Sequence, residues 1–172
     1  MTLKRRMYTV AAGAAVAPFV LVMLPAGVAN AHGYISDPPS RQAQCADGTV
    51  ECGPIQWEPQ SVEGPKGLDS CSGGNEQFSE LDDDDHGWDV HDVGSVIDFE
   101  WTNTAPHSTL NWEYFIDGNL VEQIPGNNEQ PPFTVNHEVD VSDYSGEHTI
   151  LAVWNVGDTA NAFYACTDVN IS

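Results

Sequence analysis

The chain of 172 residues is strongly acidic, with 26 Asp and Glu residues against five Lys and Arg and a formal net charge of −21. Such a surface repels phosphate backbones and anionic lipid headgroups. We therefore predict that neither nucleic acid nor a membrane surface is a partner. A neutral ligand is compatible with this charge.

The first 31 residues have the pattern of a secretion signal. Residues 4–6 are basic, residues 10–24 are mostly apolar, and Ala29 and Ala31 form a small-residue cleavage site. The apolar run is shorter than the roughly 20 residues of a membrane-spanning helix, which argues against an anchor. We predict cleavage after Ala31, a secreted extracellular protein, and a mature chain that begins at His32.

The mature chain, residues 32–172, is expected to form a single domain held by two disulfides. Its cysteines are Cys45, Cys52, Cys71 and Cys166, and in an exported protein an even number predicts disulfides with three possible connectivities. Spacing favours a local Cys45–Cys52 bond and a long-range Cys71–Cys166 bond. A zinc site is disfavoured, because no cysteine pair has the short spacing of a metal knuckle.

Several short strands and no long amphipathic helix predict an all-β fold, a β-sandwich. The first third of the mature chain, residues 32–81, is rich in Gly, Pro and Ser and is expected to form loops at one end of the sandwich. Asp117-Gly118-Asn119 predicts a hairpin turn, and the nearly continuous apolar run 150–156 predicts a strand covered on both faces. The predicted strands are 97–101, 112–116, 120–124, 135–141, 150–156 and 163–171.

The acidic run 82–85 is interpreted as a solvated turn rather than a calcium loop, because its twelfth position is Val93 instead of Glu. Four histidines lie in acidic or strand segments and are expected to be surface or core residues: His86, His91, His137 and His148. His107 differs, because it lies in a loop between two predicted strands. His32 would combine an imidazole with a free α-amino group after cleavage, which makes it a potential metal chelator.

Six segments together resemble the bacterial lytic polysaccharide monooxygenases of auxiliary activity family ten, and in particular the small chitin-active members described as chitin-binding proteins. They occur in family order over nearly the whole mature chain: HGYI at 32–35, PSR at 39–41, WEPQSVEGPKG at 57–67, APHST at 105–109, ILAVWNV at 150–156 and DTANAFY at 158–164. Pro106 occupies a position that is often arginine in the family, and the run 82–85 matches no family feature.

The resemblance implies a fibronectin-like or immunoglobulin-like β-sandwich with one copper ion on a flat face. His32 and His107 would be the metal ligands, an arrangement called the histidine brace. Phe163 would occupy the axial position, Ala105 the opposite side, and Glu63 would supply a nearby carboxylate. The implied substrate-binding residues are Trp57, Glu58, Pro59, Thr104, Asp158 and Asn161, with Trp154 as core packing near the metal.

The reaction implied by the resemblance is oxidative cleavage of glycosidic bonds in crystalline polysaccharide. Chitin, with oxidation at C1, is the first expected substrate and cellulose the second. An external electron donor and either hydrogen peroxide or dioxygen would be required, and the protein is expected to be a monomer. The alternative is a non-catalytic chitin- or cellulose-binding module, which would use the same face but would not need His32 at a processed terminus.

Overall fold

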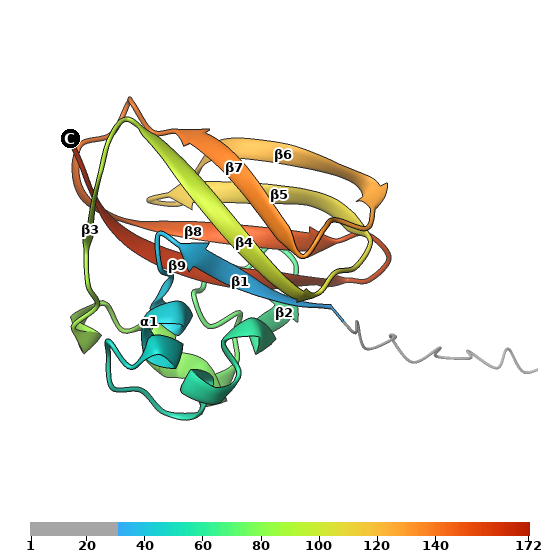
Figure 1. The fold of residues 1–172 in the computed structure, drawn as a ribbon, viewed down its shortest axis with the longest axis horizontal. Helices are drawn as coiled ribbons and strands as arrows, with labels where there is room; N and C mark the ends of the chain where they lie inside the picture. The colour runs from blue at the N-terminus through green and yellow to red at the C-terminus, as the bar shows by residue number, and fades with distance from the viewer. Residues whose placement is uncertain (1–30) are drawn as a thin grey trace, which may run out of the picture.

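Two β-sheets pack face to face in the computed structural model, which describes residues 31–172 (Figure 1). The predicted secretion signal lies outside the described residues except for Ala31. The helical segments are α1 (Arg41–Asp47) and the 3-10 turns η1 (Pro54–Trp57), η2 (Pro59–Ser61), η3 (Glu76–Asp82) and η4 (Asp84–His86). The strands are β1 (His32–Asp37), β2 (Glu63–Pro65), β3 (His91–Val93), β4 (Val96–Ala105), β5 (Thr109–Ile116), β6 (Asn119–Glu129), β7 (Thr134–Asp140), β8 (Gly146–Val156) and β9 (Asn161–Ile171).

The smaller sheet has the strand order β1-β4-β7, and the larger has the order β2-β9-β8-β5-β6 with β3 paired in parallel to β9. The inner faces bury an aromatic core that includes Phe99, Trp101, Tyr114 and Trp154. Because successive side chains of a strand point to opposite faces, the alternation predicted for 97–101 places Phe99 and Trp101 inward in β4. The β-sandwich prediction is confirmed.

Strands β8 and β9 are buried on both faces, as the apolar run 150–156 predicted. Their outer face carries a second hydrophobic cluster, in which Leu151, Val153 and Tyr164 meet side chains of the N-terminal segments such as Phe78 and Trp88. The N-terminal segments therefore cover the face of the larger sheet, as seen below β9 in Figure 1. The expectation that they sit at one end of the sandwich was wrong, because a strand that is apolar on both sides needs a cover on both sides.

The elements within residues 32–81 were not predicted, and strand β1 and helix α1 are the longest of those that lie wholly in this range. Strand β1 pairs with β4 and buries Ile35 in the core. Helix α1 has only seven residues, too few for a clear helical period, but its ends carry ordinary signals: the Ser40 hydroxyl accepts a hydrogen bond from the Ala43 N–H at 3.4 Å, and Gly48 ends the helix at φ 72°. Within residues 31–172, no helix is long and apolar enough to cross a bilayer.

The hairpin predicted at 117–119 connects β5 and β6. Leu120 pairs with Phe115 across the two strands, and Asp117 and Gly118 adopt φ values of 51° and 74°. Two consecutive residues of positive φ match the right-handed twist of the flanking strands. Strand β6 is longer than predicted and continues to Glu129.

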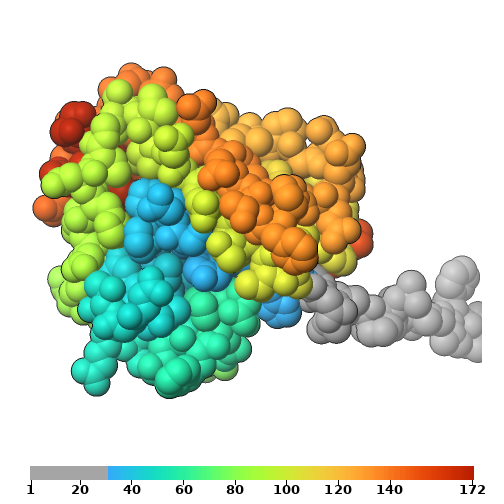
Figure 2. Space-filling model, viewed as in Figure 1, coloured from blue at the N-terminus to red at the C-terminus, as the bar shows by residue number. Residues whose placement is uncertain are grey.

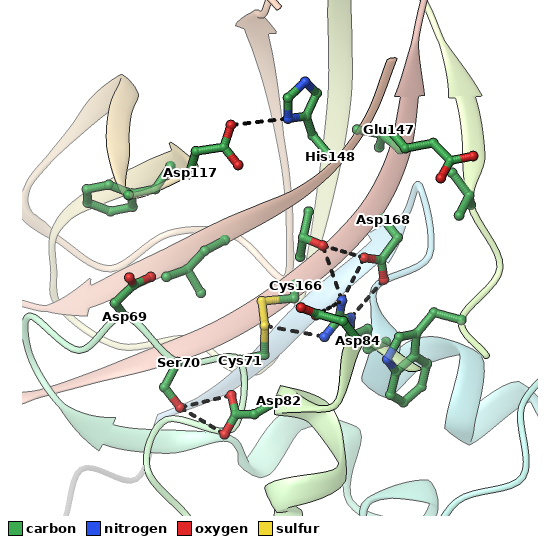
Figure 3. Close-up of a pocket in the computed structure, with 18 residues that line it drawn as sticks. Asp69, Ser70, Cys71, Asp82, Asp84, Asp117, Glu147, His148, Cys166 and Asp168 are labelled. Carbon is green, nitrogen blue, oxygen red and sulfur yellow. Dashed lines mark hydrogen bonds and ion pairs between the residues drawn. A yellow bond between two sulfur atoms is a disulfide. The ribbon is translucent and has the colours of Figure 1, made fainter. Parts of the chain in front are cut away.

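A buried arginine and two disulfides attach the N-terminal cover to the larger sheet. Arg41 is 1% exposed; its guanidinium donates hydrogen bonds to both carboxylate oxygens of Asp168 at 2.8 and 2.7 Å, and to Asp84 at 2.8 Å. Beside these groups the Cys71–Cys166 disulfide joins the loop to β9 (Figure 3), and Cys45–Cys52 closes the end of α1. These are the two disulfides that the spacing of the cysteines in the sequence favoured.

The acidic run 82–85 is exposed, as expected, but it is not merely solvated. Asp84 pairs with Arg41, and Asp82 accepts hydrogen bonds from the Ser70 hydroxyl and the Ser72 N–H at 3.1 and 3.0 Å. Part of the run therefore ties η3 and η4 to the neighbouring loop and to the anchoring arginine.

A polar network crosses the aromatic core. The Trp101 indole N–H donates to the Tyr114 hydroxyl at 3.0 Å, and that hydroxyl lies 2.6 Å from His137 Nδ1. Because the Tyr114 oxygen already accepts from Trp101, its proton is directed at His137, which must accept through a neutral ring. Burial lowers the pKa of His137 to about 4 and raises the pKa of Tyr114.

Replacing Arg41 is expected to destabilise the fold strongly. Arg41→Met leaves the nearly buried Asp168 carboxylate without its cation and should lower the free energy of unfolding by about 3–5 kcal/mol, measured by urea unfolding with the disulfides intact. The matched control is Asp84→Asn at the exposed end of the pair, which should cost less than about 1 kcal/mol. Equal small losses for both variants would show that Arg41 does not anchor the cover.

Stability is expected to fall in mild acid because of His137. The unfolded chain binds a proton at this residue below about pH 6.5, whereas the folded protein does so only near pH 4. The free energy of unfolding should therefore decrease as the pH falls through this window, by up to about 3 kcal/mol. In His137→Gln, whose side-chain oxygen can still accept from Tyr114, urea unfolding at a series of pH values should show a weaker dependence. An unchanged dependence would contradict the assignment.

Candidate metal centre and substrate face

The two histidines predicted as metal ligands lie at the same end of the smaller sheet. His32 is the first residue of β1 and pairs with Ala105, the last residue of β4. His107 follows two residues later in the loop between β4 and β5. Strand pairing therefore brings together residues more than seventy positions apart in the chain. In the full chain the nitrogen of His32 forms the peptide bond to Ala31, so an α-amino group requires cleavage at that bond.

Aromatic side chains form a floor beneath His32. The Phe163 ring, fully buried in β9, lies with its centroid 6.2 Å from that of the His32 ring and 5.3 Å from that of Trp154. The Trp154 indole N–H donates to the Thr109 hydroxyl at 2.8 Å, which fixes its orientation. A phenyl ring cannot bind a metal, so this side of His32 is closed by a group without ligand atoms.

Gly33 permits the start of β1 to approach this floor. A Cβ at position 33 would lie 2.8 Å from Asn103 Oδ1 and 3.0 Å from a ring carbon of Trp154, both shorter than real Cβ contacts allow or favour. The absence of a side chain therefore decides how closely His32 can sit against the aromatic core.

Glu63 is held beside Phe163 by the short strand β2. The two residues are paired across β2 and β9, and the Asn161 side-chain amide donates to Glu63 Oε1 at 2.7 Å. Glu63 is half-buried. The carboxylate thus has one oxygen fixed by an amide, on the strand pair that also carries the phenyl ring.

The loop that follows β8 supplies a carboxylate to His107. Asp158 Oδ1 lies 2.9 Å from His107 Nε2, and both side chains are partly exposed. Lys66 supports this loop, because its ammonium donates to the carbonyl oxygens of Val156 and Thr159 at 2.5 and 2.8 Å. A negative charge next to the imidazole favours a cation in its neighbourhood.

The predicted substrate-binding residues lie in segments that pack against, or lead into, the strands that carry His32 and His107. Trp57 ends η1 and is 81% exposed, above the fully buried Ile55 of the same turn. Glu58 and Pro59 follow it, and η2, which begins at Pro59, packs against β1. Thr104 is exposed next to Ala105 in β4. The contact between η2 and β1 therefore links the turn that carries Trp57 to the strand that begins at His32.

Asn103 and Lys66 contribute to the site but were not singled out from the sequence as residues that build it. Asn103 is 1% exposed and follows the inward positions of Phe99 and Trp101 in β4. A polar residue on a predicted buried face was a usable signal, because buried polar groups normally have a specific partner. The side-chain amide of Asn103 donates to the Pro132 carbonyl at 3.0 Å.

Two other features of the described residues do not form this centre. Cys52, Glu80 and His86 have potential ligand atoms within 4.8 Å of one another, but the Cys52 sulfur is consumed by its disulfide. A hollow of about 690 Å³ lies at the opposite end of β8 and β9, where Figure 3 shows Asp84, Asp117 and Asp168 around it. Among its acidic groups, Asp84 and Asp168 contact Arg41, and Asp117 contacts His148.

Comparison with known proteins identifies the family. Residues 32–169 match the family model described as "Lytic polysaccharide mono-oxygenase, cellulose-degrading", and the match begins at His32. The chain is 58% identical over 159 residues to a lytic chitin monooxygenase of Streptomyces ambofaciens, covering 92% of each protein. It spans 36–52% of the length of several longer curated relatives.

Similar solved structures indicate the same family. A lytic polysaccharide monooxygenase of Jonesia denitrificans superposes with a TM-score of 0.79 at 51% identity and covers 82% of this chain and 100% of that one. A Bacillus amyloliquefaciens protein solved in complex with Cu(I) superposes with a TM-score of 0.72 at 32% identity, with coverage of 82% and 100%. The chain therefore belongs to the lytic polysaccharide monooxygenases of auxiliary activity family ten, a family of copper-dependent enzymes.

Proposed function

We propose that this protein oxidatively cleaves glycosidic bonds in crystalline chitin, with oxidation at C1, and that cellulose is the second substrate. The observation that carries the proposal is the meeting of His32, His107 and the Phe163 ring at one end of the sandwich, next to the exposed Trp57. The chitin assignment is supported by the 58% identical relative, a lytic chitin monooxygenase, while the family description names cellulose.

The residues at this end fit a copper ion. One ion would be held by the α-amino nitrogen and ring of His32 and by the ring of His107, an all-nitrogen set that suits copper, which leads the divalent metals in affinity. Neither Phe163 nor Ala105 offers a ligand atom. When bound, copper would supply redox chemistry between an external electron donor and hydrogen peroxide or dioxygen.

Cleavage after Ala31 and secretion are part of the proposal. The family match that begins at His32 supports a mature chain of residues 32–172 with a signal at 1–31. The amine needed for the chelate exists only after this cleavage, because in the full chain that nitrogen is part of the peptide bond to Ala31. Secretion also places the enzyme where insoluble polysaccharide is found, and the two disulfides suit an oxidising compartment.

The surrounding side chains have separate roles. Glu63, with one oxygen held by Asn161, is placed to hold or release a proton beside the reacting centre. The Phe163 ring excludes water from one side, and Ala105 leaves little space on the other. Trp57 presents an indole that can lie against the apolar face of a pyranose ring.

The rest of the proposed substrate face is mostly polar and lies in turns and at strand ends. Thr104 and Asp158 flank His107, while Glu58 and Pro59 follow the indole; with Asn161 they form the contacts that would orient a chain of sugars. These groups are neutral or acidic, so the face suits an uncharged polymer. The protein would act as a monomer that lies flat on the solid.

Copper binding is expected to depend on the processed terminus. Protein that begins at His32 should bind one Cu(II) ion by isothermal titration calorimetry, whereas one extra residue before His32, or His107→Ala, should weaken binding by at least about 100-fold. His148→Ala, on the opposite end of the sheet, is the control that should bind as the wild type does. Equal affinity of the extended and processed proteins would refute the proposed ligand set.

Catalysis is expected to yield oxidised products. Copper-loaded mature protein incubated with chitin and ascorbate should release aldonic-acid oligosaccharides detectable by mass spectrometry. Glu63→Gln keeps the side-chain shape and an oxygen for Asn161 but removes the charge, and it should slow product release by about 100-fold or more without loss of copper. Native-mass products only, or none from chitin and cellulose, would instead favour a non-catalytic binding module.

A further inference from the structure

Phe133 is the second most exposed large apolar side chain among residues 31–172. It is 69% exposed, after Trp57 at 81%. The other strongly exposed apolar side chains of these residues are aliphatic and 45–52% exposed: Val90, Val96, Leu110 and Leu120. Single exposed apolar residues are common, so exposure matters only together with position.

Phe133 lies at the same end of the molecule as His32 and His107. It precedes Thr134, the first residue of β7, which pairs with Thr102 of β4. The Phe133 carbonyl accepts a hydrogen bond from the Asn103 N–H at 2.7 Å. Because β4 separates β1 from β7 and neighbouring strands lie about 4.8 Å apart, the Phe133 backbone is about 10 Å from that of Gly33, which also pairs with Asn103 and directly follows His32.

The segment that carries Phe133 is held in place. The two preceding residues are Pro131 and Pro132, whose rings restrict the backbone. The Asn103 amide donates to the Pro132 carbonyl at 3.0 Å, and the Gln130 amide donates to the Pro106 carbonyl at 2.9 Å. The exposed ring therefore stands on a fixed base, so little conformational entropy would be lost when it is covered.

The two exposed aromatic residues lie on opposite sides of the proposed metal centre. Trp57 belongs to the turns that pack against β1 through η2, while Phe133 begins β7 on the far side of β4. Figure 1 shows β1 beginning and β4 ending between the teal turns below and β7 above. In Figure 2 the orange surface of the segment before and within β7 borders the yellow surface that follows β4.

We propose that Phe133 is a second aromatic contact for the polysaccharide, on the side of the metal centre opposite Trp57. This inference rests on the proposed function. A phenyl ring offers no hydrogen bond and gains by covering the C–H face of a pyranose ring. The flanking Glu129 and Gln130 are exposed and carry no positive charge, which suits a neutral polymer rather than an anionic one.

Contacts on both sides of the centre do more than add affinity. With Trp57 alone, a sugar chain could pivot about one stacking contact. A second ring, carried by backbone about 10 Å from that of Gly33, restricts that rotation and so limits which glycosidic bond lies over His32 and His107. Phe133 would therefore act as a positioning residue as well as a binding residue.

The test is a binding isotherm of mature protein on crystalline chitin. Phe133→Ala should weaken binding about three- to tenfold, while Phe133→Tyr and Phe133→Trp should retain most of the affinity. Leu120→Ala is the matched control, because this exposed apolar residue lies at the opposite end of β5 from His107. Thermal unfolding and copper titration of each variant should be unchanged, since the ring is largely exposed.

The outcomes separate this inference from the proposed function. If the wild type binds chitin and Trp57→Ala binds weakly, but Phe133→Ala binds as tightly as Leu120→Ala, the second contact is refuted and the proposed function stands. If the wild type binds neither chitin nor cellulose, the proposed function fails and this inference fails with it. Weakened binding by Phe133→Ala that Phe133→Trp restores is the expected result.

Discussion

Burial of β8 and β9 on both faces is the constraint on which the rest of the fold depends. The aromatic core of the sandwich covers one face, and the N-terminal segments cover the other. Strand β9 then carries different groups along its length: Phe163 at the proposed metal centre, and Cys166 and Asp168 where the cover is anchored. One rigid strand therefore connects the site to the attachment points of the loops that form much of its rim.

The site combines four segments that are distant in sequence. The start of β1 brings His32, the turns before β2 bring Trp57, the end of β4 leads to His107, and β9 brings Phe163. Two local features set their approach: Gly33, which leaves room for Asn103 and Trp154, and the Asn161 amide, which holds Glu63. A site built on strand ends in this way can be flat and still rigid, as contact with a solid surface requires.

The distribution of positive charge agrees with a neutral substrate. The only Lys and Arg side chains in residues 31–172 are Arg41 and Lys66, and both are used within the fold: Arg41 binds Asp168 and Asp84, and Lys66 donates to loop carbonyls beside Asp158. The described part of the chain thus has no lysine or arginine left for an anionic partner. Binding to a neutral polymer then has to come from aromatic faces and hydrogen bonds, which agrees with the two exposed aromatic residues near the centre.

Much of this was visible in the sequence. The alternation at Phe99 and Trp101 predicted a strand with one buried face, and the apolar run through Trp154 predicted a strand buried on both faces. Both patterns can be read directly from the order of apolar and polar residues. The ordered segments from His32 to Phe163 predicted the family and therefore the candidate ligands. Helix α1 was missed because its seven residues make only about two turns. Strand β1 was missed because the Gly-, Pro- and Ser-rich composition of residues 32–81 indicated loops.

Other features depend on where distant strands meet. The N-terminal segments cover the face of the larger sheet, rather than its end, because they pack against Leu151 and Tyr164. Arg41 anchors this cover because Asp168 of β9 lies within hydrogen-bond distance of it. In the sequence Phe133 is marked only by the two prolines before it, and the pairing of β7 with β4 brings it to the end of the sheet that carries His32. Residue order encodes local periodicity and the chemistry of individual side chains, but proximity between strands arises only when the chain packs its apolar faces together.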